Sequence, residues 1–280
     1  MKKSLLALAV LGAFSSLASA QSSVTLSGMV DAGVRYTKDQ YSVTGSQSGY
    51  NNFTISGRED LGGGMTAFFV LNHRFSINNG QVNSGASGAQ GSNGTPPFWR
   101  NSFVGLGSKA LGDVRIGRML MPLQDMNGGF DAFDTGTVGT VHTGGITATV
   151  RANNAIYYRS PSWGGFSLHA AIAAAEGQSA SENIGGIGAG VGRYYPPAAP
   201  SANPINGERP MGGSIRFASG PMNFGAAYDV NTFEQETWGV YGSWNFGFMT
   251  LMGQYESGDN AFANVAGGTQ TNVYDSESVD

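Results

Sequence analysis

The stretch that decides the fold is residues 24–36, which read Val-Thr-Leu-Ser-Gly-Met-Val-Asp-Ala-Gly-Val-Arg-Tyr. Apolar or small residues such as Val24 and Val34 occupy every second position, and mostly polar residues such as Asp31 and Arg35 occupy the positions between them. This two-residue period is that of a β-strand with one apolar and one polar face. A strand of this length with two such different faces suits a sheet that separates lipid from water.

A targeting segment precedes this strand. Lys2 and Lys3 are followed by the apolar run 5–11, and Ala18-Ser19-Ala20 forms a small-x-small cleavage site. This is the pattern of a secretory signal peptide over residues 1–20. An exported chain that opens on a two-faced strand is typical of an outer-membrane β-barrel.

Composition narrows the possible functions. The 280 residues include 44 Gly and no Cys, and only 12% are charged, which argues against a charged, helix-rich soluble enzyme and excludes disulfides and thiolate metal sites. Without Lys2 and Lys3, 13 basic and 19 acidic side chains remain, a net charge of −6, so nucleic acid is not an expected partner. After the signal, no apolar run reaches the ~18 residues of a membrane helix. A membrane form must therefore cross as strands, whose backbone groups pair only in a closed sheet.

The connections between the expected strands alternate between short and long. Short glycine-bearing turns alternate with long links, as in barrels with periplasmic turns and extracellular loops. A soluble β-sandwich remains the alternative fold. We expect one domain over residues 21–280. The expected strands are 24–36, 51–58, 65–75, 98–108, 112–118, 150–160, 165–175, 209–219, 221–231, 236–246 and 247–257, and the long links are 37–50, 76–97, 119–149, 176–208 and 258–270.

Five short motifs, in order and at matching spacing, resemble the general diffusion porins of Gram-negative bacteria, β-proteobacterial type. The resemblance implies a transmembrane antiparallel β-barrel of sixteen strands in the full-length protein, a homotrimer, and passive diffusion of small hydrophilic solutes. It also implies that the third long loop folds into the lumen and narrows it. The motifs are Gly57–Gly64, Phe103–Leu106, Gly112–Arg118, Asn154–Pro161 and Gly164–Phe166.

The chain departs from this family's pattern at two places. The family ends on a strand with a terminal aromatic residue, whereas residues 274–280 read Tyr-Asp-Ser-Glu-Ser-Val-Asp. Only eleven to twelve strands are expected here, and an open sheet would expose backbone edges to lipid, so we expect the barrel domain to be incomplete at its C-terminus. Asn52 stands where family members usually carry an arginine, and Arg58 lies on the same face.

The resemblance also names a candidate pore constriction. Loop 119–149 matches the inward-folded loop and supplies acids. Strict alternation turns Arg151 inward but places Arg118 with Val114 and Ile116 on the lipid face; the resemblance favours the lumen for both arginines. A lumen bordered by arginines favours anions weakly. The expected basic wall is Arg151, Arg118, Arg58 and Arg35, and the expected loop acids are Asp125, Asp131 and Asp134.

Other functional classes receive less support. His73, His142 and His169 lie in separate segments without the spacing of a metal site, so we expect no enzyme activity, metal or cofactor. The expected partners are two further copies of the chain, outer-membrane lipid and lipopolysaccharide, and small hydrophilic solutes and ions. The alternative function is a surface-exposed adhesin or structural outer-membrane barrel without a conducting pore.

Overall fold

The computed structural model describes residues 23–38, 40–45, 51–80, 82, 98–132, 151–174, 209–231 and 236–258. The expected signal peptide lies outside these residues. In the described part of the chain, no helix is long and apolar enough to cross a membrane. The strands are β1 Ser23–Met29, β2 Ala32–Thr37, β3 Gln40–Gly45, β4 Asn52–Gly62, β5 Met65–Arg74, β6 Trp99–Ser108, β7 Gly112–Leu120, β8 Arg151–Arg159, β9 Phe166–Ala173, β10 Met211–Ser219, β11 Met222–Val230, β12 Glu236–Asn245 and β13 Thr250–Gly258, and the helix is α2 Pro122–Gly129.

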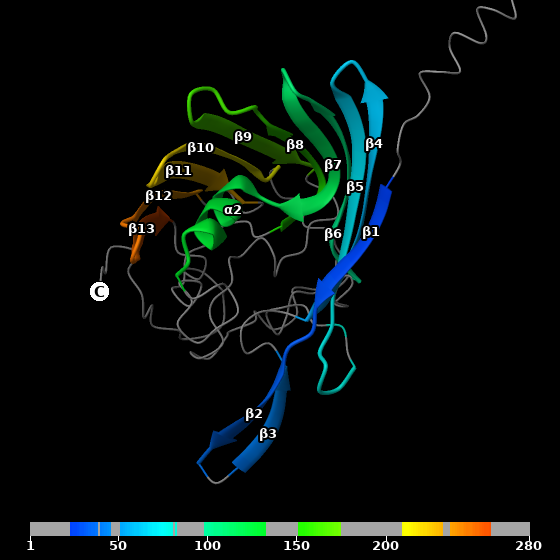
Figure 1. The fold of residues 1–280 in the computed structure, drawn as a ribbon, viewed down its shortest axis with the longest axis vertical. Helices are drawn as coiled ribbons and strands as arrows, with labels where there is room; N and C mark the ends of the chain where they lie inside the picture. Colours follow the sequence, from blue (N-terminus) through cyan, green and yellow to red (C-terminus); the bar gives the residue numbers. More distant parts are fainter. Residues whose placement is uncertain are drawn as a thin grey trace, which may run out of the picture.

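Eleven of the strands form one antiparallel sheet in the order β1-β4-β5-β6-β7-β8-β9-β10-β11-β12-β13. Apart from the β2–β3 pair, each strand lies beside the strand that follows it in the chain, which is the up-and-down topology of a barrel wall. The sheet is strongly curved, and α2 lies on its concave side (Figure 1). The all-β, antiparallel class predicted from the sequence is confirmed.

The two faces of the sheet differ as the alternation predicts. On the face turned away from α2, apolar side chains are exposed: Val104 by 60%, Ile116 by 56% and Val240 by 46%. Their chain neighbours Gly105 and Tyr241 are buried on the concave side. A continuous apolar exterior is unfavourable in water and favourable against lipid.

The expectation of a single strand over 24–36 is wrong. The strand ends at Met29 and resumes as β2, which pairs with β3 in a separate two-stranded sheet. At the break, the backbone N–H of Asp31 donates to the side-chain Oδ1 of Asn51 instead of to a neighbouring strand. The strand β3 was not expected either, because it lies within the link 37–50. The alternation of its residues is short and lacks a charged face.

A short turn joins β6 to β7 at the position the sequence indicated. Gly112 has a φ of +87°, and a side chain there would run into the backbone carbonyl of Arg159 on β8. Only glycine combines this φ with such a close approach, so the turn can lie directly against the neighbouring strand.

The helix α2 was not expected, because the sequence analysis treated 119–149 as loop throughout. Pro122 occupies the first turn, where its missing N–H and fixed φ suit a helix start. Leu123, Met126 and Phe130 then follow at a spacing that places them on one face, and all three are buried. The helix is stable here because that face packs on the sheet.

Candidate functional site

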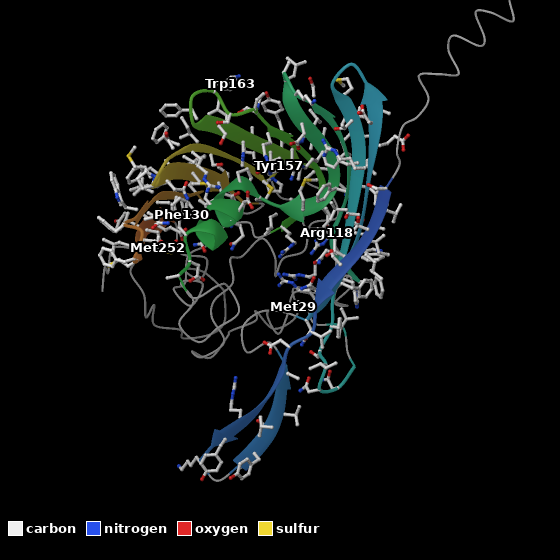
Figure 2. All side chains as sticks on the ribbon, viewed as in Figure 1. Met29, Arg118, Phe130, Tyr157, Trp163 and Met252 are labelled. Carbon is white, nitrogen blue, oxygen red and sulfur yellow. The ribbon has the colours of Figure 1, made fainter. Side chains whose placement is uncertain are left out.

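The first part of loop 119–149 lies against the inner wall of the sheet. Leu123, Met126 and Phe130 form a buried cluster with Ala227 of β11 and Tyr241 of β12. The Phe130 and Tyr241 rings are 5.5 Å apart. Figure 2 shows Phe130 on the same side of the sheet as α2. The wall opposite this segment is where the sequence predicted the arginines.

Arg118 and Arg151 come together where β7 ends and β6 and β8 begin. Arg118 Nε donates to the backbone carbonyl of Trp99 at 3.2 Å, and its Nη1 donates to Asn153 Oδ1 at 2.5 Å. Arg151 is buried, and its Nε donates to Asn101 Oδ1 at 3.1 Å. Neutral acceptors thus help to fix both guanidinium groups.

The end of β7 departs from regular pairing at Arg118. The register between β7 and β8 shifts between Gly117 and Met119, with Arg118 at the shift. Val114 and Ile116 are exposed, whereas Arg118 is half-buried and Met119 is buried. Strict alternation, which assigned Arg118 to the face of Val114 and Ile116, therefore does not extend to this residue.

The structure separates the other two predicted arginines from this pair. Arg58 lies on β4, where its Nη2 donates to Thr66 Oγ1 at 3.0 Å and its guanidinium lies 5.9 Å from the Phe68 ring. Arg35 lies on β2, opposite Ser42 in the two-stranded sheet that projects away from the curved wall (Figure 1). Arg35 is therefore not brought to the site.

The three predicted loop acids fall at different places. Asp125 is on α2 with its side chain 49% exposed, and its Oδ2 lies 3.9 Å from Nδ1 of His169 on β9. Asp131 follows the helix and is half-buried. Asp134 lies outside the described residues.

A further arginine on the inner wall was missed by the sequence analysis. Arg115 of β7 lies 5.5 Å from the ring of Phe103, 5.9 Å from Phe68 and 5.6 Å from Tyr157. Its Nε also contacts Asp113 Oδ1 at 2.5 Å. Cation–π contacts and the carboxylate hold this guanidinium in place.

Two more arginines continue this inner surface. Arg159 lies 3.9 Å from Asp113, so one carboxylate faces two guanidinium groups. Arg216 of β10 donates from Nε to Asn223 Oδ1 at 2.7 Å and lies 5.9 Å from the Phe130 ring beyond α2. The Tyr157 hydroxyl lies 2.9 Å from His169 Nδ1, which joins this surface to the His169–Asp125 pair.

The profile of a family described as Gram-negative porin matches residues 7–277 of this chain. The chain belongs to the Gram-negative porin family. It is 32% identical to outer membrane porin protein 32 of Delftia acidovorans, over 98% of this chain and 74% of that protein. It is 28% identical to an outer membrane porin protein of Bordetella pertussis, over 82% of this chain and 59% of that protein.

The fold of this porin also matches solved structures. An anion-selective porin from Comamonas acidovorans superposes with a TM-score of 0.64 at 24% identity, over 85% of this chain and 68% of that chain. As a member of this family, the chain is an outer-membrane β-protein. Porins are channels rather than enzymes, and among the described residues no group of His, Asp or Glu could hold a metal ion.

The inner-wall residues of this porin that were missed carried a readable signal. Arg115 alternates with Val114 and Ile116, and Arg216 lies between the apolar Ile215 and Phe217. Parity alone would have turned both arginines inward. The resemblance placed the expected arginines at the strand ends beside the long loop, whereas Arg115 and Arg216 lie within strands.

Proposed function

We propose that this porin is a channel for passive diffusion of ions and small hydrophilic solutes, with its lumen narrowed by loop 119–149. The observation that carries the proposal is the position of α2, which packs on the concave wall with Leu123 and Met126 buried against it. A loop segment in this place reduces the cross-section available to solutes without blocking it by a separate domain.

Charges on the facing wall set the selectivity in this proposal. Arg118 and Arg151 stand near the start of the loop, and we call them the loop-side arginines. A second group, the turn-side arginines, lies nearer the short turns between the strands. Of the acids, Asp113 faces Arg115 and Arg159, Asp125 lies on α2 beside His169, and Glu256 of β13 contacts α2. The turn-side arginines are Arg58, Arg115, Arg159 and Arg216.

The arginines of this wall support a weak preference for anions. At about 8 Å, a single unpaired charge changes the energy of a permeant ion by roughly 0.5 kcal/mol in water and roughly 2 kcal/mol at an effective dielectric near 20. Salt reduces this further, since the Debye length is about 8 Å at physiological ionic strength. We therefore propose a selectivity of a few-fold, consistent with the likeness in fold to the anion-selective porin from Comamonas acidovorans.

The proposed assembly is a homotrimer in the outer membrane, in contact with lipid and lipopolysaccharide. The exposed apolar face of the sheet, including Val104, Ile116 and Val240, supports contact with lipid or with other subunits. In this proposal residues 21–280 belong to one barrel domain that follows a cleaved signal peptide over 1–20.

Planar-bilayer recording tests the proposal. The full-length protein is purified from outer membranes and shown by its heat-dependent gel mobility to be assembled. Under a tenfold KCl gradient we expect stepwise conductance. We also expect a reversal potential of the sign that results when chloride is more permeant than potassium. Assembled protein that opens no channels would overturn the proposal in favour of an adhesin or structural barrel.

A further inference from the structure

The helix α2 rests on a wall that is shaped to receive it. A Cβ atom at Gly225 of β11 would overlap the Cε of Met126, so a larger residue there would displace the end of this side chain. A Cβ at Gly212 of β10 would lie 3.5 Å from Cδ of Pro122. The helix therefore packs directly on the strand backbones. Apolar contact of this kind brings the helix close but does not fix it along the wall, because such contacts are not directional.

A directional contact fixes it. Glu256 of β13 accepts a hydrogen bond from Asn127 Nδ2 of α2 at 2.6 Å, and the same oxygen, Oε1, accepts one from the Tyr241 hydroxyl at 2.6 Å. Hydrogen bonds to a carboxylate are shorter and stronger than those between neutral groups. Asn127 and Glu256 are 129 residues apart in the chain, so this contact ties the loop to a distant strand.

The surroundings of Glu256 leave space for this contact. Opposite it on β12, a Cβ at Gly239 would lie 2.5 Å from the Tyr241 hydroxyl oxygen and 2.9 Å from Glu256 Cγ. A side chain at that position would push the tyrosine and the glutamate apart. On the other flank of α2, Asp125 is half exposed and 3.9 Å from His169, beyond ordinary hydrogen-bond length. The Glu256 contact is thus the stronger of these two lateral ties.

We propose that Glu256 is a positioning residue for the constriction: it holds α2 against the far wall and so sets how far the loop enters the lumen. This inference rests on the proposed channel function, but its structural content does not. When the tie is lost, α2 is still attracted to the apolar wall, yet it exchanges between docked and displaced positions. The channel then fluctuates between conductance levels instead of keeping one.

The test compares two substitutions that remove the same charge. E256Q keeps a side-chain oxygen that can accept from both donors, whereas E256L leaves Asn127 and Tyr241 without their acceptor. Losing a hydrogen bond to a charged acceptor corresponds to about a tenfold or larger change in the docked–displaced equilibrium. We expect E256L to raise the time spent in sub-conductance levels by at least about tenfold, and E256Q to raise it less.

A second readout does not depend on conduction. The chain has no cysteine, so spin labels at G129C and G253C report only the distance between the end of α2 and β13. Among the described residues, a side chain at either glycine meets open space beyond its own chain neighbours, so the labels fit. We expect a broader distance distribution in E256L than in the parent. The matched control is Q254L on the same strand, because Gln254 Oε1 has no hydrogen-bond partner among the described residues.

The outcomes separate the two proposals. If the parent protein opens no channels, the proposed function fails, and the label distances still decide the role of Glu256. If E256L keeps both a narrow distribution and a single conductance level, the positioning role is overturned. Should E256L fail to assemble, Y241F and N127A each remove one donor. A narrow distribution in both of these variants would equally overturn the role.

Discussion

The inner wall offers a charge substitution whose effect can be estimated from the structure. Asp113 contacts Arg115 at 2.5 Å and Arg159 at 3.9 Å, so one carboxylate offsets part of two positive charges. The variant D113N is isosteric and keeps Oδ1 as an acceptor for Arg115. It removes one negative charge beside the turn-side arginines and leaves both guanidinium groups in place. We expect the anion preference to rise.

The size of the rise follows from distance and screening. For an ion about 8 Å away, one charge contributes roughly 0.5 to 2 kcal/mol as the effective dielectric falls from that of water to about 20. At about 0.1 M salt the Debye length of about 10 Å reduces this to about 0.2 to 0.9 kcal/mol. The charge acts on chloride and on potassium with opposite sign, so the difference between the two ions is twice this energy. The chloride-to-potassium permeability ratio should therefore rise by about 2-fold to 20-fold. The lower part of that range is favoured, because the Asp113 and Arg159 side chains are 21% and 42% exposed.

The assay is the reversal potential under a tenfold KCl gradient, with the single-channel conductance as a check that the pore is otherwise unchanged. D60N is the matched control. Asp60 is exposed at the β4–β5 turn, where its Oδ1 accepts from the Gly62 N–H at 2.9 Å, and asparagine can keep that bond. It should shift the reversal potential less than D113N. A conducting D113N channel with an unchanged ratio, or one shifted toward cations, would refute the placement of this charge at the permeation path.

Three further substitutions probe the wall, the helix seat and the lipid face. G225V forces a side chain into the space of Met126 and should move α2 toward the lumen, lowering single-channel conductance; an unchanged conductance would contradict the packing described. R216Q should lower the chloride-to-potassium permeability ratio by about 2-fold to 20-fold in the same gradient, and no shift would place Arg216 outside the ion path. V240R puts a charge on the exposed apolar face at a cost of about 2–4 kcal/mol near mid-membrane, so urea unfolding in lipid vesicles should show lower stability, whereas equal stability would mean that this face is wet.

Much of the fold follows from local sequence. The alternation in 222–231 and 249–256 gave both strands and their faces, because the side-chain period of a strand is a property of the backbone itself. Glycine-bearing turns such as that at Gly112 marked where strands reverse, because the required φ is open to few other residues. Family resemblance then added Arg118 and Arg151, which the structure brings to one corner.

Alternation gave no face assignment where strands carry aromatic residues on both sides. The faces of residues 65–75 and 98–108 could not be assigned from the sequence, since neighbouring residues such as Phe68 and Phe69 are both apolar. The structure separates them by neighbours: Phe68 covers Gly105 on the concave side with Arg115, whereas Phe69 covers Gly57 on the other face. Which glycine an aromatic ring covers depends on register between strands, which no single strand encodes.

The sequence by itself predicted an export signal and determined the two-faced strands, the family and the order of the short turns, because each of these depends on residues close together in the chain. Tertiary structure alone decided the break at Asp31, the irregular pairing beside Arg118, and the seat of α2. It also decided the contact between Asn127 and Glu256. These depend on which residues meet across strands far apart in sequence, where a shift of one residue in pairing changes every contact.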